Sequence, residues 1–285
     1  MKIVKYISII MSVVCLASCD KHEIEYMADP LVEDMAEFQL HYFVPVIADA
    51  ANYIYKVDIN GRTFANSTTP LTTYNAVPSV GVGRFFAEKA GKIDIKLYMS
   101  TALNLVYTKS VDLTPGKWNI FVYDFDKDPI VFDNGYPYET VVTNNTGEVC
   151  WVKFYNFLYE RGGIPTDLKL QYQYQYTMDI NTKQKSEWLN VGSPVGFGET
   201  TGWQRIPVIK EVYISQGSAR IDYKIRVQDE NENYVNDLLL TNTNGTAFVA
   251  YGDYWTATIG RRYHHIFGGY RAQLPIASVR QFVAQ

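Results

Sequence analysis

Alternation of apolar and polar side chains is the feature that most constrains this chain of 285 residues. Segments 93–98, 118–123 and 221–228 each place an apolar side chain at every second position. A period of two is typical of a β-strand that has one face on a core and the other in water. No segment sustains the 3.6-residue period of an amphipathic helix. The sequence therefore predicts an all-β protein.

Turn signals divide the alternating segments at intervals of about 8–12 residues. They include Asn60-Gly61, Pro115-Gly116 and Asn244-Gly245, which favour hairpins or loops. Many short strands at this spacing indicate antiparallel β-sandwiches. The 23 tyrosines agree with this fold class, because tyrosine suits half-buried pleated surfaces.

The N-terminus has the layout of a secretory signal peptide. Lys2 and Lys5 precede an apolar run over 7–16, and the small residues Ala17 and Ser18 follow it. The run has about ten residues, whereas a membrane-spanning helix needs about 20. We expect a signal peptide at residues 1–18 rather than a transmembrane helix.

The segment Leu16-Ala17-Ser18-Cys19 resembles a bacterial lipobox. The resemblance implies that Cys19 is lipid-modified and becomes the first mature residue, anchored to a membrane by several acyl chains. Residues 19–36 then form an acidic tether, since seven of the residues 20–37 are acidic. A short acidic stretch after a lipidated cysteine resembles the surface-export signal of Bacteroidota-type lipoproteins. This second resemblance implies an outer-membrane protein exposed at the cell surface.

A faint internal repeat divides the rest of the chain. The turn-rich run 133–147 is the expected joint, so we predict an N-terminal β-sandwich at 37–135 and a C-terminal one at 148–285. Three pairs of segments carry the repeat: 38–42 with 151–156, 91–96 with 218–224, and 115–120 with 251–256.

This arrangement resembles a family of outer-membrane lipoproteins of unknown function from Bacteroidota-type bacteria, which carry tandem Ig-like domains. In that family an aromatic opening strand leads to an alternating aliphatic strand, and a late strand with glycine and an aromatic residue closes each domain. The resemblance implies two Ig-like sandwiches in tandem at the cell surface, without an assigned activity.

Cysteine content argues against a disulfide framework. Cys15 leaves with the signal peptide and Cys19 carries lipid, so only Cys150 remains. Cys150 lies in an apolar segment, which predicts a buried strand residue rather than a reactive thiol.

The chain offers weak candidates for a metal site. Asp124, Asp126 and Asp128 have the spacing of the first calcium ligands of an EF-hand, but Pro129 and Gly135 occupy the positions of its glycine and its bidentate glutamate. We expect a solvated acidic turn and no metal.

The histidines are also poor metal ligands. His264 and His265 are adjacent, so they would point to opposite faces of a strand. A surface loop or a strand end is the simpler interpretation for this pair.

No catalytic constellation emerges. The sequence has no Gly-x-Ser-x-Gly elbow and no phosphate-binding loop, and no two of its acids stand out as a glycosidase pair. A net charge of −4 gives no basic footprint for nucleic acid. We therefore expect a non-enzymatic protein without a cofactor and without a nucleic-acid partner.

Aromatic residues supply the candidates for ligand binding. The tyrosines of segment 168–176 could stack on sugar rings, but Leu168 and Leu170 share their face, which favours a core ladder. Trp188, Trp203 and Tyr263, expected in loops, are the better ligand candidates, with local packing as the competing interpretation.

The combined prediction is a lipid-anchored binding or structural module of the cell envelope. We expect the lipid on Cys19 to anchor it to the membrane, and its ligand to be a glycan or an envelope protein. Two alternatives stay open. One is a glycan-binding lipoprotein of a nutrient-uptake system, and the other is a pilin-like adhesion subunit or anchor that polymerises by strand exchange.

Overall fold

A computed structural model describes residues 34–78, 84–135, 148–209, 212–215, 217–229 and 233–284. The described residues form β-strands, one short 3-10 helix η1 (Ala50–Asn52) and no α-helix. Residues 34–285 make one compact unit. The predicted all-β sandwich fold is therefore confirmed. Cys19, the signal peptide and residues 136–147 of the expected joint lie outside the described residues.

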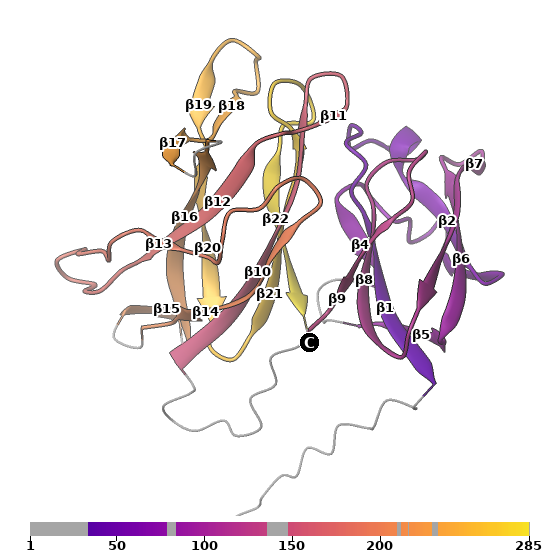
Figure 1. Cartoon of the computed structure of the whole chain (residues 1–285), viewed down its shortest axis with the longest axis horizontal. Coiled ribbons are helices and arrows are strands. Elements are labelled where there is room, and N and C mark those ends of the chain that lie inside the picture. Colours follow the sequence, from indigo (N-terminus) through magenta and orange to yellow (C-terminus); the bar gives the residue numbers. More distant parts are fainter. Residues whose placement is uncertain are drawn as a thin grey trace, which may run out of the picture. The chain divides into compact units, whose positions relative to one another are not determined.

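The first half of the chain contains two sheets (Figure 1). The β1 sheet has the order β4-β1-β8-β9, and β5 also pairs with β1. Its strands are β1 (Met35–Tyr42), β4 (Asn75–Val77), β5 (Phe86–Lys89), β8 (Gly116–Val122) and β9 (Ile130–Asp133). The β2 sheet has the order β3-β2-β6-β7. Its strands are β2 (Ile54–Ile59), β3 (Arg62–Ala65), β6 (Gly91–Met99) and β7 (Asn104–Leu113).

The second half also contains two large sheets, and a separate hairpin of β18 (Leu239–Thr241) and β19 (Phe248–Ala250). The β10 sheet consists of β10 (Val149–Glu160), β11 (Ile164–Pro165), β14 (Thr200–Pro207), β21 (Arg262–Tyr270) and β22 (Ser278–Ala284). The β12 sheet consists of β12 (Lys169–Tyr176), β13 (Leu189–Asn190), β15 (Tyr213–Ser215), β16 (Ser218–Gln228), β17 (Tyr234–Asp237) and β20 (Gly252–Thr258).

The predicted hairpin signals lie where the strands turn. Asn60 and Gly61 both have positive φ angles, 50° and 80°, between the antiparallel β2 and β3. This backbone suits the two-residue turns that join twisted strands. Asn244-Gly245 lies between β18 and β19.

Each half has its own core. Phe38 and Leu40 of β1 pack with Ile95 of β6 between the β1 and β2 sheets. Phe154 of β10 packs with Tyr172 of β12 between the β10 and β12 sheets, with ring centroids 5.0 Å apart. Alternate residues of β1 and β10 supply these contacts, as a period of two requires.

The other faces of the β1 and β10 sheets pack on each other. Phe43, one residue past β1, and Phe121 of β8 join Tyr155 and Phe157 of β10 in a third apolar cluster. The rings of Phe121 and Phe157 are stacked with centroids 4.9 Å apart. The middle strands are therefore buried on both faces. For segment 118–123 the prediction of one solvated face is wrong, because its second face covers the other half.

The opening strand of each half pairs in parallel with a late strand, β1 with β8 and β10 with β21. A further antiparallel strand, β9 or β22, follows in each sheet. The β6 and β16 strands each lie inside the second sheet of their half. Two of the three predicted repeat pairs, 38–42 with 151–156 and 91–96 with 218–224, thus occupy equivalent positions.

The third repeat pair is wrong. Trp118 lies in β8, which corresponds to β21, whereas Trp255 lies in β20. The β20 strand is an antiparallel neighbour of β16, as β7 is of β6. The glycine and tryptophan shared by segments 115–120 and 251–256 therefore do not mark equivalent strands.

Candidate functional site

The β12 strand presents opposite chemistries on its two faces. Tyr172 and Tyr174 point into the core, as predicted, and are 0% and 7% exposed. Because side chains alternate along a strand, Gln171, Gln173 and Gln175 lie on the side of the sheet away from the core. Gln171 and Gln173 are buried there, 0% and 7% exposed, whereas Gln175 is half-buried. The predicted core ladder is confirmed for the two tyrosines, but Met178 is exposed and does not continue it.

Charged side chains occupy the matching face of β16. Ile221, Tyr223 and Ile225 are buried in the core, so Arg220, Asp222, Lys224 and Arg226 lie on the outer face. Antiparallel pairing aligns Asp222 with Gln175 on one side and with Tyr254 of β20 on the other. We call this surface the polar–aromatic face. It consists of Gln175, Lys185, Trp188, Arg220, Asp222, Lys224, Arg226, Tyr234 and Tyr254.

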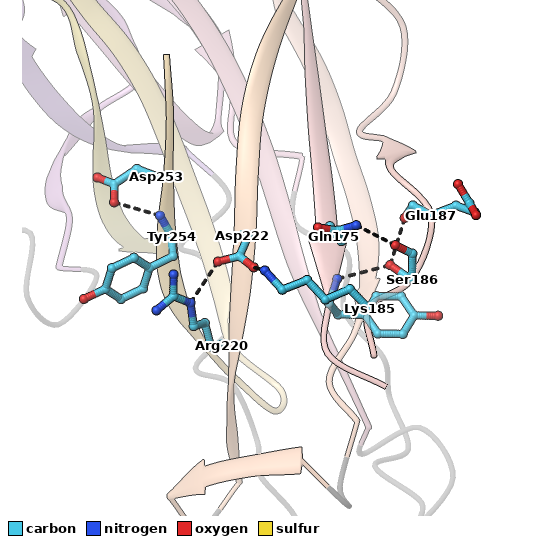
Figure 2. A network of polar contacts seen from close by, with 9 residues as sticks. Gln175, Lys185, Ser186, Glu187, Arg220, Asp222, Asp253 and Tyr254 are labelled. Carbon is cyan, nitrogen blue, oxygen red and sulfur yellow. Dashed lines mark hydrogen bonds and ion pairs between the residues drawn. The ribbon is translucent and has the colours of Figure 1, made fainter. Parts of the chain in front are cut away.

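Asp222 is the centre of the ionic contacts shown in Figure 2. Its carboxylate accepts from Lys185 Nζ and, at 2.8 Å, from Arg220 Nε. Partial burial raises the pKa of the Asp222 carboxyl, but the hydrogen bonds from Lys185 and Arg220 outweigh that effect, so its pKa is lowered. Asp222 therefore stays ionised.

Cations lie over the aromatic rings of the face. The Arg220 guanidinium carbon is 3.8 Å from the ring centroid of Tyr254, and Lys224 Nζ is 4.8 Å from that of Trp188. Such contacts hold a ring in one orientation. Tyr254 remains 54% exposed and Trp188 37% exposed, so both rings still offer apolar surface to a ligand.

Four cations of the face share two carboxylates. Asp222 forms ion pairs with Lys185 and Arg220, while Asp237 of β17 lies 3.1 Å from Lys224 Nζ and 3.6 Å from Arg226 Nε. Asp237 also lines a cleft of about 720 Å³ with Lys169, Leu239 and Arg271. The face thus continues into a concave surface at one end, within the size range of ligand sites.

Of the three aromatic ligand candidates, only Trp188 belongs to this face. Trp203 lies in β14, not in a loop, and its Nε1 donates to the Asn134 carbonyl oxygen at 2.6 Å. Tyr263 lies in β21, is 1% exposed and packs against Trp255. The loop assignment was wrong for both, because both residues lie in strands of the β10 sheet. A ring as buried as Tyr263 has no surface for stacking.

Asp124 and Asp128 of the acidic loop, two of the weak metal candidates, have separate partners. Asp124 accepts the Asp126 amide at 2.8 Å, whereas Asp128 forms an ion pair with Lys109 at 3.1 Å. No group of three or more histidine, cysteine or acidic side chains suited to a metal occurs in the described part of the chain.

The two adjacent histidines are not at the surface. His264 and His265 are 1% and 0% exposed in the middle of β21, which corrects the expected loop or strand end. Their predicted orientation to opposite faces holds, since His264 is bonded to Tyr155 and His265 to Tyr172. Cys150 is buried and free, as predicted.

Sequence reasoning missed the glutamines and Tyr254. The signal was present in segment 168–176, where glutamine alternates with tyrosine. Once the tyrosines are assigned to the core, the glutamines must face out. The contribution of Tyr254 depends on the pairing of β16 with β20, which no local pattern shows.

Comparisons with known proteins add little. No protein-family model and no curated protein matches the chain. Among solved structures it is similar to one described as "a putative adhesin from Bacteroides ovatus", with 11% identity and a TM-score of 0.17. The match covers 87% of this chain and 95% of that one. A likeness this low says nothing about what the chain binds. In the described residues, no helix is long and apolar enough to cross a membrane.

Proposed function

We propose that this chain is a lipid-anchored envelope protein that binds carbohydrate, without catalysis, through the polar–aromatic face. The observation that carries the proposal is the pair of exposed rings, Trp188 and Tyr254, each in contact with a cation of β16. Sugar rings present apolar C–H faces beside hydroxyl groups. A surface that combines flat aromatic rings with charged and polar side chains complements both features.

The ion pairs beside the two exposed rings favour a neutral ligand. Arg220 and Lys224, the two cations that contact the exposed rings, are already bonded to Asp222 and Asp237. A polyanion would have to compete with these carboxylates, whereas a sugar hydroxyl can share them as donor and acceptor. The face therefore suits a neutral, polyhydroxylated chain.

The lowered pKa of Asp222 supports binding rather than acid catalysis at this face. A general acid in glycoside hydrolysis needs a carboxyl group whose pKa is raised. The pKa of Asp222 is lowered instead, because Lys185 and Arg220 bond to the ionised form. Asp222 can accept hydrogen bonds from a ligand but is poorly suited to donate a proton.

The lipobox and the acidic tether support the cellular part of the proposal. Lipidation at Cys19 would hold the protein on the outer membrane, and the tether would present the sandwiches at the cell surface. A surface-exposed glycan binder is also consistent with the nutrient-uptake alternative.

A glycan array tests the proposal, with the purified lipoprotein in detergent micelles as the probe. Binding of a neutral glycan should weaken at least tenfold in Trp188→Ala and in Tyr254→Ala, since a central stacking residue contributes about 1.4 kcal/mol or more. Tyr98→Ala is the matched control, because Tyr98 lies under Lys56 at 4.8 Å in the first half. Absence of any glycan ligand, or binding that survives both substitutions, would overturn the proposal.

A further inference from the structure

A buried polar cluster lies between the β1 and β10 sheets, close to the joint of the two halves. Lys153 of β10 and Asn134, one residue past β9, are 5% and 0% exposed. Asn119 of β8 is also fully buried and bonds to Asn134. A buried amine beside buried carboxamides calls for an explanation, because burial of an unpaired ammonium group is costly.

Lys153 is held against the backbone of the joint. Its Nζ donates to the carbonyl oxygen of Asp133 at 2.8 Å, directly before Asn134 in the chain. The Nζ atom lies 5.7 Å from the ring centroid of Tyr155 and 5.9 Å from that of Trp203. Burial lowers the pKa of Lys153 to about 8, so about a tenth of the amine is neutral and nucleophilic at pH 7.

Asn134 is polarised for attack. Its Oδ1 accepts from Asn119 Nδ2 at 2.8 Å, which withdraws electron density from the side-chain carbonyl carbon. Among the described residues its Nδ2 has no hydrogen-bond partner. Trp203 Nε1 fixes the main chain of this residue through the 2.6 Å bond to its carbonyl oxygen.

We propose that Lys153 and Asn134 join in an intramolecular isopeptide bond. The neutral Lys153 Nζ attacks Asn134 Cγ, a new Nζ–Cγ amide forms, and the Cγ–Nδ2 bond breaks to release ammonia. The proton lost by Nζ ends on the departing nitrogen. The charge of the neighbouring Asp133 carboxylate partly offsets the effect of burial on the pKa of Lys153. The reaction is a transamidation and needs no oxidant, reductant or cofactor.

The bond would tie the end of β9 to β10 by a covalent link across the joint. The mature chain has one cysteine besides Cys19, the buried Cys150, so it has no disulfide to do this. A cross-link of this kind restricts the unfolded chain as a disulfide does.

Tryptic digestion of the denatured full-length lipoprotein tests the proposal directly. Lys153 is the only tryptic site between Lys127 and Arg161. An acylated Lys153 resists trypsin, so the expected product is a single peptide 128–161 that is about 17 Da lighter than its sequence mass. Fragment ions from bonds between residues 134 and 153 should be missing, because the link closes that loop.

Each possible result of the digestion either supports or overturns the isopeptide bond. Cleavage after Lys153 into peptides 128–153 and 154–161, or an uncut peptide of normal mass, overturns the proposal. Loss of the same mass with normal cleavage after Lys153 would identify a succinimide at Asn134-Gly135 and also overturn it. Asn134→Ala is the control in the expected case, since it should restore cleavage after Lys153.

Discussion

His264 and His265 are neighbours in β21 whose side chains serve two different layers of the protein. His264 Nδ1 lies 2.9 Å from the Tyr155 hydroxyl between the β1 and β10 sheets. His265 Nδ1 lies 2.9 Å from the Tyr172 hydroxyl inside the second sandwich. One dipeptide thus links the core of the second half to the contact between the halves.

Acid should destabilise the protein through its buried histidines. Burial lowers the pKa of His41 to about 4 and that of His265 to about 3, and it lowers that of His264 well below its usual value. Below pH 6.5 the unfolded chain therefore binds protons that the folded chain does not. The free energy of unfolding should fall as the pH drops from about 6.5 toward 4, by up to about 1.4 kcal/mol per pH unit for each histidine. Urea unfolding at a series of pH values measures this slope.

The control for the pH dependence is His264→Gln, which keeps an acceptor for Tyr155 but does not titrate. Its stability should depend less steeply on pH than that of the wild type. An equal slope in both proteins would show that His264 contributes nothing to the acid sensitivity.

The sequence predicted those strands that have one solvated face. Ile93, Ile95 and Leu97 of β6 are buried, while Asp94 and Lys96 between them are exposed, as the period of two requires. The period of two did not predict burial in strands whose two faces are both covered. In β10 almost every residue is buried, because one face meets the β12 sheet and the other meets the first half. Packing between sheets far apart in sequence leaves no local period.

For the same reason, the sequence predicted only part of the candidate site. Alternation in β12 separates its tyrosines from its glutamines, and this could have placed Gln175 on the outer face from the sequence alone. The contact of Lys224 with Trp188 joins β16 to a residue before β13. That contact depends on strand order, which is a tertiary property.

Two tyrosines of the second half should respond differently to truncation. Tyr172→Ala removes a fully buried ring that stacks on Tyr223, with centroids 5.1 Å apart, and should cost about 3–5 kcal/mol of unfolding free energy. Tyr254→Ala removes an exposed ring and should cost less than about 1 kcal/mol. Urea denaturation at neutral pH compares them. Equal losses would mean that Tyr254 is a structural residue and not part of a binding face.

Metal chelation and thiol reduction should leave the melting temperature unchanged. Asp128 is paired with Lys109 rather than gathered with Asp124, and Cys150 is buried without a disulfide partner. Thermal unfolding with and without chelator or reductant tests this. A drop of several degrees with chelator would point back to the loop of Asp124, Asp126 and Asp128.

Cys19→Ala should abolish lipid attachment and block or alter processing of the precursor. The expectation depends on the lipobox, because the first mature residue of such a protein carries the acyl chains on its thiol. Metabolic labelling with a fatty-acid probe reads the result. A variant that still incorporates the probe would contradict the assignment.

Limited proteolysis should cut first within 136–147, and the two halves should stay together after the cut. The turn-rich composition of this segment predicts the site. The halves should remain associated because the Tyr159 hydroxyl donates to the Tyr123 carbonyl oxygen at 2.7 Å and Phe121 stacks on Phe157. Mass spectrometry identifies the cut, and native size-exclusion chromatography should show one species at the position of the intact protein. Two half-sized species would contradict the packing of the β1 sheet on the β10 sheet, and a first cut inside either sandwich would mean that the boundary lies elsewhere.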